Sequence, residues 1–597
     1  MCGIAGIIDR SSAHTSATKV RSMCDSIAHR GPDGAGFWSS NDGTVHLGHR
    51  RLSIIDLSEK GAQPMTFQQR YTITFNGEIY NFQALKNELS AAGYQFFSTT
   101  DTEVVLAAYD YWKEKCLEHF DGMFAFALYD IETEELFCAR DRFGEKPFFY
   151  TIQDDVFYFA SEIKAFWSIG LKKIINKSLM YLFLAEDLVE NPTNPKDTFY
   201  EGIHQLDPAS YFYFGKNSQQ PIVKKYWEIS ISEEKSELTF DESVTQFQDL
   251  FNKAVASRTI ADVTVGCSLS GGLDSSSIVA SIAQTNNSIP TFSARFDDFK
   301  KDEGAHIELV SNHFQTKQHN KWITSSDFEE QFDRLLYHQD EPFQSGSIFA
   351  QYCVYEAAKN EGIKVVIDGQ GADELLGGYD KDFAFYAREL QINNKAFQQF
   401  VAQIEAHHGT TIQVRKMDLF ALKHPKIFQL AVALKNRIWT KVPTGIATSF
   451  HAKYAPKKPV FQRHKSLKSS LKHELTIQGL PKLLRFADRN AMAHSVESRL
   501  PFLSPELVAF VFQSNSDYFL HQGWSKALLR SAMKHMLPEK ISQRKDKIGF
   551  EAPHVQWLKT ASMQNRIEQS RKLLIEKGYI TEKYTDSWKI LIAAYYL

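Results

Sequence analysis

DVTVGCSLSGGLDSSSIVA (262–280) is the stretch that organises the larger part of this chain. Its valine-rich beginning predicts a buried strand, and its end predicts a helix over 274–284. Between them, SGGLDSSS (270–277) is a turn of small residues, whose backbone N–H groups can surround a phosphate where the helix begins. It is not a Walker A loop, because no GxxxxGKS or GxxxxGKT pattern occurs. Asp274 would repel a bare phosphate, so its presence predicts an intervening Mg²⁺ ion.

Helices and strands alternate around this stretch. A helix is predicted over 241–258, a strand at TFSARF (291–296), a helix over 348–360 and a strand at IKVVIDG (363–369). This order predicts an α/β domain with a parallel sheet covered on both faces, followed by a mostly helical part from residue 383.

A second acidic cluster, DGQGADELLGGY (368–379), follows the strand at 363–369. Open α/β sheets bind ligands at the carboxyl ends of their strands, so we assign Asp373 to Mg²⁺ and Glu374 to substrate. A pair of acids that cap a helix is the alternative interpretation.

The first part of the chain has a different pattern. Short strands are predicted at TVHLGHRRLSII (44–55), YTITFNGEI (71–79), GMFAFALYD (122–130), ELFCARDR (135–142) and DDVFYFAS (154–161), and helices at 17–28, 80–92 and 102–115. We expect a layered α+β domain over 2–215, a polar linker over 216–240 and the α/β domain over 241–597.

Composition excludes several classes of protein. The 597 residues are 43% hydrophobic and carry a net charge of −3, which gives no general attraction to nucleic acid or to anionic membranes. No run of 18 apolar residues and no signal peptide is present, and the six cysteines form no CxxC pair, so we expect a cytoplasmic protein with no nucleic-acid or membrane partner. The basic stretch 451–475 is expected to be a solvated or mobile surface insertion, with a nucleic-acid patch as the alternative.

Cys2 directly follows the initiator Met. After removal of Met1, Cys2 would carry a thiol and a free α-amine that can serve as the base of that thiol. Arg51 offers a fork for a carboxylate, and Asp101 can take an ammonium group. The Asn76–Gly77 pair can present a side-chain amide and a backbone N–H to a developing oxyanion.

A lone cysteine at position 2 would be weak evidence without the segments that follow it. These are HRGPDG (29–34), HRRLSIID (49–56), GAQPM (61–65), FNGEIYN (75–81), DTE (101–103), DGMFAFALYD (121–130) and DRFGEKPFFY (141–150). Together they resemble the glutaminase domain of class II amidotransferases, which are N-terminal-nucleophile hydrolases with αββα layers. The resemblance implies that Cys2 attacks glutamine, that Asn76 and Gly77 form the oxyanion hole, and that glutamine is held by Arg51, Leu52, Ser53, Ile54, Ile55, Asn76, Gly77, Glu78 and Asp101.

The rest of the chain resembles the synthetase domain of the asparagine synthetase family, an adenine-nucleotide-binding domain of the pyrophosphatase type. The resemblance rests on SGGLDSSS, on the acidic cluster at 368–379, and on DRNAMAHSVESRLPFLS (488–504), SKALLRSAM (525–533) and RKDKIGFEAP (544–553). It implies that Lys526 neutralises phosphate charge and that Asp274 and Asp373 bind the metal. The implied ATP site comprises Leu269, Ser270, Gly271, Gly272, Asp274, Ser275, Ala294, Asp368 and Gly369, and the implied acceptor site comprises Gln370, Glu374, Asp488 and Arg499.

The two resemblances imply one reaction. Glutamine hydrolysis supplies ammonia, ATP with Mg²⁺ converts aspartate into β-aspartyl-AMP, and the ammonia displaces AMP to give asparagine. Glutamine, aspartate and ATP are therefore the expected partners, and a homodimer is the assembly considered.

Two residues depart from the family pattern. Gln370 stands where the well-studied synthetases have Glu in the motif GEGxDE, and Ser504 stands where they have Asp in PFLD. These departures leave open a different acceptor, such as a sugar acid or a peptide. A regulatory binding protein and a β-lactam-forming relative are disfavoured, because Cys2 accompanies Asp274, Asp373 and Lys526.

Overall fold

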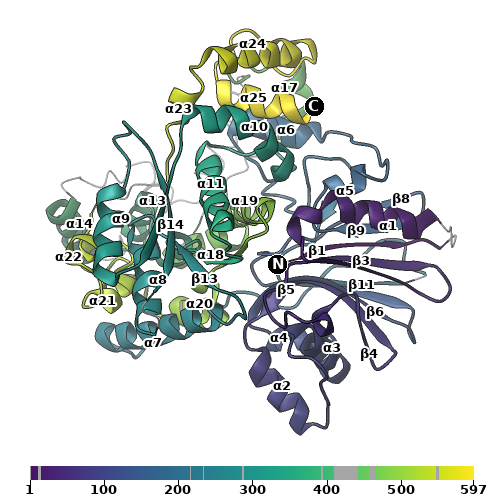
Figure 1. Cartoon of the computed structure of the whole chain (residues 1–597). Coiled ribbons are helices and arrows are strands. Elements are labelled where there is room, and N and C mark those ends of the chain that lie inside the picture. The colour runs from purple at the N-terminus through teal and green to yellow at the C-terminus, as the bar shows by residue number, and fades with distance from the viewer. Residues whose placement is uncertain are drawn as a thin grey trace.

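The computed structural model in Figure 1 describes most of the chain. The described residues are 2–10, 15–215, 217–232, 234–285, 288–390, 394–408, 442–456, 464, 466–545 and 550–597. The motif RKDKIGFEAP and the basic stretch therefore lie partly outside the described residues.

The amino-terminal half contains two stacked antiparallel sheets of six strands each. Apolar side chains such as Ile4, Leu47, Ala125 and Phe159 are buried between them, because alternate residues of each strand point to the facing sheet. One sheet has the order β10-β8-β9-β1-β3-β2, with bounds His204–Gln205, Phe149–Gln153, Val156–Ala160, Gly3–Ile8, Val45–Arg51 and Gly34–Ser39. The other has the order β12-β11-β7-β6-β5-β4, with bounds Lys224–Lys225, Ser210–Gly215, Glu135–Arg140, Gly122–Asp130, Tyr71–Ile79 and Met65–Phe67.

Helices cover the outer faces of both sheets and complete the expected αββα layers. Val20, Met23 and Cys24 of α1 pack against the first sheet, and α2 and α3 pack against the second. The helices of this half are α1 (Thr15–Ser26), α2 (Phe82–Ala91), α3 (Asp101–Trp112), α4 (Cys116–His119), α5 (Lys164–Trp167) and α6 (Lys177–Glu186).

The second half is built on a five-stranded parallel sheet with the order β15-β14-β13-β16-β17. The strands are Lys317–Trp322, Pro290–Arg295, Val265–Ser268, Val365–Ile367 and Glu497–Arg499. The central strands β13 and β16 are short; β16 (VVI) is fully buried, and β13 (VGCS) buries its two middle residues, as expected for strands covered on both faces. The stretch 262–280 therefore forms the predicted strand, turn and helix.

The helices of the second half surround this sheet and form the carboxyl-terminal part (Figure 1). The first group is α7 (Phe240–Arg258), α8 (Leu273–Ala283), α9 (Gly304–Phe314), α10 (Ser325–Gln339), α11 (Ser347–Asn360), α12 (Ala372–Leu376), α13 (Asp380–Leu390) and α14 (Asn394–His408). The second group is α17 (Thr448–Tyr454), α18 (Leu467–Thr476), α19 (Leu480–Ala493), α20 (Pro505–Gln513), α21 (Ala527–Met533), α22 (Glu539–Ser542), α23 (His554–Trp557), α24 (Ala561–Glu576) and α25 (Ser587–Tyr596).

The described part of the chain from residue 383 is mostly helical, as expected, and it also contributes β17, which completes the sheet beside β16. The structure corrects two expectations about individual segments. Lys224 and Lys225, in a stretch predicted to be irregular, pair with β11 as an edge strand. Within the basic stretch, α18 is not a surface insertion, because Leu467, Leu471 and Leu475 are fully buried in the core of the second half.

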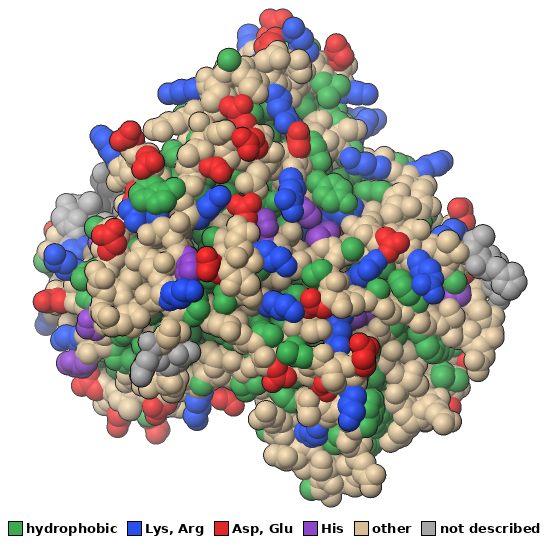
Figure 2. Space-filling view, viewed as in Figure 1, with side chains coloured by type: hydrophobic (Ala, Val, Ile, Leu, Met, Phe, Trp, Pro, Cys, Tyr) green, Lys and Arg blue, Asp and Glu red, His purple; other side chains and the backbone are tan. Residues whose placement is uncertain are grey.

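The surface shows no field of one sign on the face drawn in Figure 2. Lys and Arg side chains alternate there with Asp and Glu, consistent with the small net charge. Among the described residues, no helix combines the length and the hydropathy needed to cross a bilayer.

Candidate active sites

Cys2 lies directly before β1, at the boundary between the two halves (Figure 1). Its backbone N–H donates to Oδ1 of Asn76 at 2.9 Å, and its carbonyl accepts from Nε of Arg30 at 3.0 Å. Burial raises the pKa of the Cys2 thiol, whereas the amino terminus and Arg51 act in the opposite direction. Hydrogen bonds to its backbone N–H and carbonyl therefore fix the position of Cys2, the candidate nucleophile.

Asn76 and Gly77 lie side by side on β5, opposite Ala125 and Phe124 of β6. Nδ2 of Asn76 is buried and has no hydrogen-bond partner among the described residues. A Cβ at position 77 would lie 2.2 Å from the carbonyl oxygen of Met123, so only glycine fits against β6. The amide of Asn76 is therefore a free donor beside Cys2, as an oxyanion hole requires.

A pocket in front of Cys2 brings together most residues of the predicted glutamine site. Its lining comprises Cys2, Arg51, Leu52, Ile54, Ile55, Gly61, Gln63, Phe75, Gly77, Glu78, Thr100, Asp101, Thr102 and Glu497. Ser53 and Asn76 do not line it. The N–H of Ser53 donates to Asp33, and its carbonyl faces Lys364. The guanidinium of Arg51 is held at the pocket by the carbonyl oxygens of Asp56 and Ser58.

The acidic side chains of this pocket are deeply buried. Asp101 is the first residue of α3 and accepts from the N–H of Ile79 at 2.9 Å. Burial raises the pKa of Asp101 to about 6. Burial also raises the pKa of Glu78, and the charge of Asp101 adds to that shift while Arg499 opposes it. Such a site favours a ligand that brings its own positive charge.

Sequence reasoning missed several residues of this pocket. Gly61 and Gln63 belong to the quoted segment GAQPM, so the motif contained them without indicating their role. Glu497 comes from β17 of the other half, almost four hundred residues or more along the chain from Asp101 and Glu78. No spacing pattern could place it here, because only the packing of the two halves brings it to the pocket.

The predicted nucleotide turn joins β13 to α8. The N–H of Ser270 donates to Oγ of Ser275 at 3.2 Å, and the N–H of Gly272 donates to Oγ of Ser270 at 3.3 Å. Gly271 has a φ of +71°, and a Cβ there would lie 2.7 Å from Cβ of His306. Leu269 precedes the turn, and Ala294 lies on the neighbouring strand β14.

Lys526 links the two acidic motifs beyond the carboxyl ends of β13 and β16. Its Nζ lies 2.5 Å from Oδ2 of Asp274 and 2.6 Å from Oδ1 of Asp373. Burial lowers the pKa of Lys526, but the two carboxylates outweigh that effect and the net shift is upward. Three segments that are distant in sequence thus meet at Lys526. Its ammonium, now paired with two carboxylates, could instead bind a phosphate group of a nucleotide.

Two carboxylates that share one cation also suit Mg²⁺. This ion commonly takes one or two protein carboxylates and completes its shell with water and substrate phosphates. The described residues contain no group of three or more His, Cys, Asp or Glu side chains arranged for a metal. Asp274 and Asp373 therefore fit a metal that arrives with a nucleotide.

Asp368, Gly369 and Gln370 follow β16 and lead into α12. Asp368 accepts from the hydroxyl of Tyr355 at 3.2 Å, and its pKa is raised by burial. A Cβ on Gly369 would lie 3.2 Å from Cβ of Asp274, so this loop packs closely against the nucleotide turn. Glu374 is buried and accepts from the hydroxyl of Tyr379.

Asp488 and Arg499, which were predicted to bind the acceptor, pair with other protein groups in this structure. Both oxygens of Asp488 accept from the guanidinium of Arg30, at 2.8 and 3.1 Å. Arg499 is fully buried and donates to Glu497 and to the carbonyl oxygens of Arg258 and Ile260. Both side chains therefore hold the boundary between the halves.

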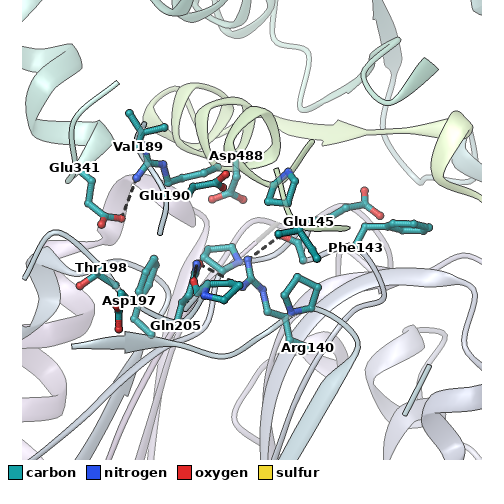
Figure 3. A pocket seen from close by; sticks show the side chains of 18 of the residues that line it. Arg140, Phe143, Glu145, Val189, Glu190, Asp197, Thr198, Gln205, Glu341 and Asp488 are labelled. Atoms are coloured by element: carbon teal, nitrogen blue, oxygen red, sulfur yellow. Dashed lines mark hydrogen bonds and ion pairs between the residues drawn. The ribbon is translucent and has the colours of Figure 1, made fainter. Parts of the chain in front are cut away.

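Asp488 also borders a second pocket at this boundary (Figure 3). Arg140 from β7 and Glu190 from the segment after α6 line it together with Asp488 of α19. Arg140 donates to the carbonyl oxygens of Gly144, Lys146 and Leu206, so its charge stabilises the loop rather than an acid.

Comparison with known proteins agrees with this arrangement of two sites. Residues 1–227 match the family model "Glutamine amidotransferase domain", and residues 246–587 match the model "Asparagine synthase". The chain belongs to the asparagine synthase family. As a family member, it combines an ATP-utilising synthase domain with a glutamine amidotransferase domain.

Individual relatives span nearly the whole chain. Asparagine synthetase (glutamine-hydrolyzing) 3 of Bacillus subtilis (strain 168) is 29% identical, covering 98% of this chain and 93% of the relative. The putative asparagine synthetase (glutamine-hydrolyzing) 2 of Methanocaldococcus jannaschii is 34% identical over 64% of this chain and 76% of its own. Amidase chry2 of Gibberella zeae is 27% identical, covering 93% of this chain and 90% of the relative.

Proposed function

We propose that the chain is a glutamine-hydrolysing asparagine synthetase with its glutaminase over 2–215 and its synthetase over 241–597. The observation that carries the proposal is Lys526, whose ammonium joins Asp274 of the nucleotide turn to Asp373 of the second acidic motif. A lysine and two aspartates at the carboxyl ends of parallel strands suit the binding and cleavage of a nucleoside triphosphate.

The glutaminase reaction begins at Cys2. With Met1 removed, the α-amine takes the thiol proton, and sulfur attacks the side-chain amide carbon of glutamine. Nδ2 of Asn76 and the N–H of Gly77 stabilise the oxyanion, and the α-ammonium returns the proton to the leaving nitrogen so that ammonia departs. Water then hydrolyses the thioester to glutamate and the free thiol of Cys2. Arg51 takes the α-carboxylate of glutamine, and Asp101 and Glu78 take its ammonium group.

The synthetase reaction activates a carboxylate. An acceptor oxygen attacks the α-phosphorus of ATP, the bond to the β-phosphate breaks, and pyrophosphate leaves as an acyl-AMP forms. Lys526 and the backbone of 270–275 stabilise the leaving charge, and Mg²⁺ held by Asp274 and Asp373 would screen phosphate repulsion when bound. Ammonia then attacks the acyl carbon and AMP departs.

We propose aspartate as the acceptor, with Glu374 and Gln370 beside its binding place. A different carboxylate is the second candidate, and Gln370 is the observation that favours it, because a neutral amide replaces the acid of the family motif. Amidase chry2 also supports this candidate, because it matches this chain over nearly as great a length as the asparagine synthetase of Bacillus subtilis does, yet it is named an amidase.

The products of ATP cleavage test the proposal. Purified protein receives ATP, Mg²⁺ and ammonium chloride with aspartate, or with a panel of sugar acids and short peptides in its place. AMP and pyrophosphate that form only with aspartate support asparagine synthesis. AMP formed only with another acid selects the second candidate, and ADP with phosphate contradicts the assignment of the nucleotide turn.

A further inference from the structure

Strand β17 (Glu497–Arg499) lies between the two candidate active sites. It pairs in parallel with β16, and Ile367 is opposite Arg499. Successive side chains of a strand point to opposite faces, so Glu497 and Arg499 share one face and Ser498 occupies the other. All three side chains are buried.

The face with Glu497 and Arg499 meets the glutamine pocket. Glu497 lines this pocket together with Cys2 and Asp101. Nε of Arg499 donates to Oε1 of Glu497 at 2.6 Å, and Nη2 of Arg499 lies 3.4 Å from Oε2 of Glu78. The second half thus supplies Glu497 to the pocket lining and the positive charge of Arg499 beside Glu78. The other lining residues belong to the first half.

The opposite face meets the loop assigned to ATP. The hydroxyl of Tyr355 contacts Oγ of Ser498 at 3.0 Å and Oδ2 of Asp368 at 3.2 Å. The N–H of Asp368 donates to the carbonyl oxygen of Arg499 at 3.0 Å. A shift of Asp368 on nucleotide binding would therefore act directly on the backbone of β17.

We propose that Glu497 and Arg499 are positioning residues of the glutaminase, so that the glutamine site is complete only when the synthetase half is docked. Arg499 holds the carboxylate of Glu78 in place, and its positive charge opposes the increase in the pKa of Glu78 that burial and Asp101 cause. Glu497 orients Arg499 and sets the charge of the pocket wall. The inference rests on the proposed glutaminase activity.

The two residues have opposite electrostatic effects on Glu78. The charged groups that face Glu78 are Asp101 of α3, Arg499 and Glu497 of β17, and the amino terminus. Loss of the positive Arg499 raises the pKa of Glu78, so glutamine binding fails at higher pH. Loss of the negative Glu497 lowers the pKa values of Glu78 and Asp101, so binding persists to lower pH.

The experiment compares Arg499→Gln, Glu497→Gln and Glu356→Gln in the full chain. Glu356 of α11 is the matched control. It is also a glutamate in an ion pair, with Lys321 at 3.2 Å, but it does not line the glutamine pocket. Glutamate release from glutamine is measured from pH 5 to pH 9, and kcat and KM are separated. Ammonium-dependent AMP formation in the same preparations reports whether the synthetase half is intact.

We expect the acidic limb of kcat/KM to move up by about one pH unit in Arg499→Gln and down in Glu497→Gln, mainly through KM. Glu356→Gln should retain the wild-type profile, and Arg499→Lys should restore part of the loss. Unchanged limbs, or limbs that move in the same direction, contradict the inference. If Arg499→Gln does not fold, the downward shift in Glu497→Gln decides. A wild-type protein without glutaminase activity would instead contradict the proposed function.

Discussion

Asn76 contacts Cys2 with one atom and leaves another free for the reaction. Oδ1 accepts from the backbone of Cys2 at 2.9 Å, and Nδ2 is buried without a hydrogen-bond partner in the described part of the chain. A buried donor without a partner is costly, and an oxyanion would satisfy it only as the reaction proceeds. At the residue scale, the site is therefore complementary to a charge that glutamine does not yet carry.

Replacement of Cys2 tests the separation of the two reactions. Cys2→Ala should abolish glutamine-dependent amide synthesis and leave ammonium-dependent synthesis near the wild-type rate, because Lys526 and its two aspartates are untouched. Both rates are measured as AMP formation with the same acceptor. Glutamate release by the variant would contradict the role of Cys2, and retention of Met1 on the wild-type chain should mimic the substitution.

Gln370 permits a test based on pH. A glutamate at this position could accept a proton from ammonium, whereas an amide can only donate and accept hydrogen bonds. If a base is useful there, Gln370→Glu should gain amidation rate near neutral pH and depend less steeply on pH than the wild type. If the residue only orients the acceptor, the variant should lose aspartate affinity by carboxylate repulsion. Rates against pH with aspartate and ammonium distinguish these outcomes.

Candidate catalytic and binding residues could be predicted when they lie within one short sequence motif. Cys2, Asn76, Gly77 and Asp101 were predicted from segments whose residue types suit the chemistry. Glu497 was not predicted, since its function depends on which face of a buried strand meets the other half. The contact between Asp488 and Arg30 was not predicted either, because a motif does not show where a side chain points.

At the element scale, the close packing of two loops builds the nucleotide site. Gly378 lies after α12, and a Cβ there would come within 1.9 Å of Oδ1 of Asp373 and 2.4 Å of Cε of Lys526. Both atoms belong to the ion pair between Asp373 and Lys526, so an added Cβ would require at least one of these two side chains to shift. A single methyl group is therefore expected to displace the carboxylate or the ammonium from its present position.

Gly378→Ala should reduce AMP formation by about tenfold or more, because misplacement of about 1 Å can cost a hundredfold in rate. Glutamine hydrolysis measured without ATP should be nearly unchanged. Gly362→Ala is a control for the loss of a glycine, since nothing lies within 4 Å of its added Cβ, although its φ of +74° costs some stability. Equal AMP formation by Gly378→Ala and wild type would contradict the packing argument.

Long apolar elements were predictable, whereas short or polar strands were not. The helix and strand around 262–280 follow from valine content, small residues and periodicity. Strand β15 has the sequence KQHNKW, which gives no apolar signal because it lies at the edge of the sheet. Strand β17 has only three residues, and it is defined by its pairing with β16 rather than by its own composition.

At the scale of the whole molecule, buried charges hold the two halves together. Arg30 of the first half lies 2.8 Å from both Glu162 and Asp488, and Lys146 lies 3.9 Å from Asp488. Burial alone would raise the pKa of Asp488, but Arg30 and Lys146 reverse that effect and lower it. The ionised carboxylate is therefore part of the boundary between the halves.

Asp488→Ala should destabilise the protein by about 3–5 kcal/mol, because it leaves Arg30 buried without one of its partners. Since the folded-state pKa of Asp488 is lowered, its contribution is present above its unfolded pKa and is lost as pH falls through the folded pKa. Thermal unfolding followed from pH 7 downward should show a smaller loss of Tm with acid in the variant than in the wild type. Parallel curves would show that this ion pair does not contribute to the acid sensitivity.

The fate of the amide nitrogen of glutamine tests the central claim most directly. Purified protein is incubated with ATP, Mg²⁺, aspartate and glutamine labelled with ¹⁵N in its side-chain amide, in the presence of unlabelled ammonium chloride. The account predicts asparagine with ¹⁵N in its side-chain amide, formed with equal amounts of glutamate, AMP and pyrophosphate. Unlabelled asparagine would show that the two sites do not act together, and no amide product from aspartate would contradict the proposed reaction.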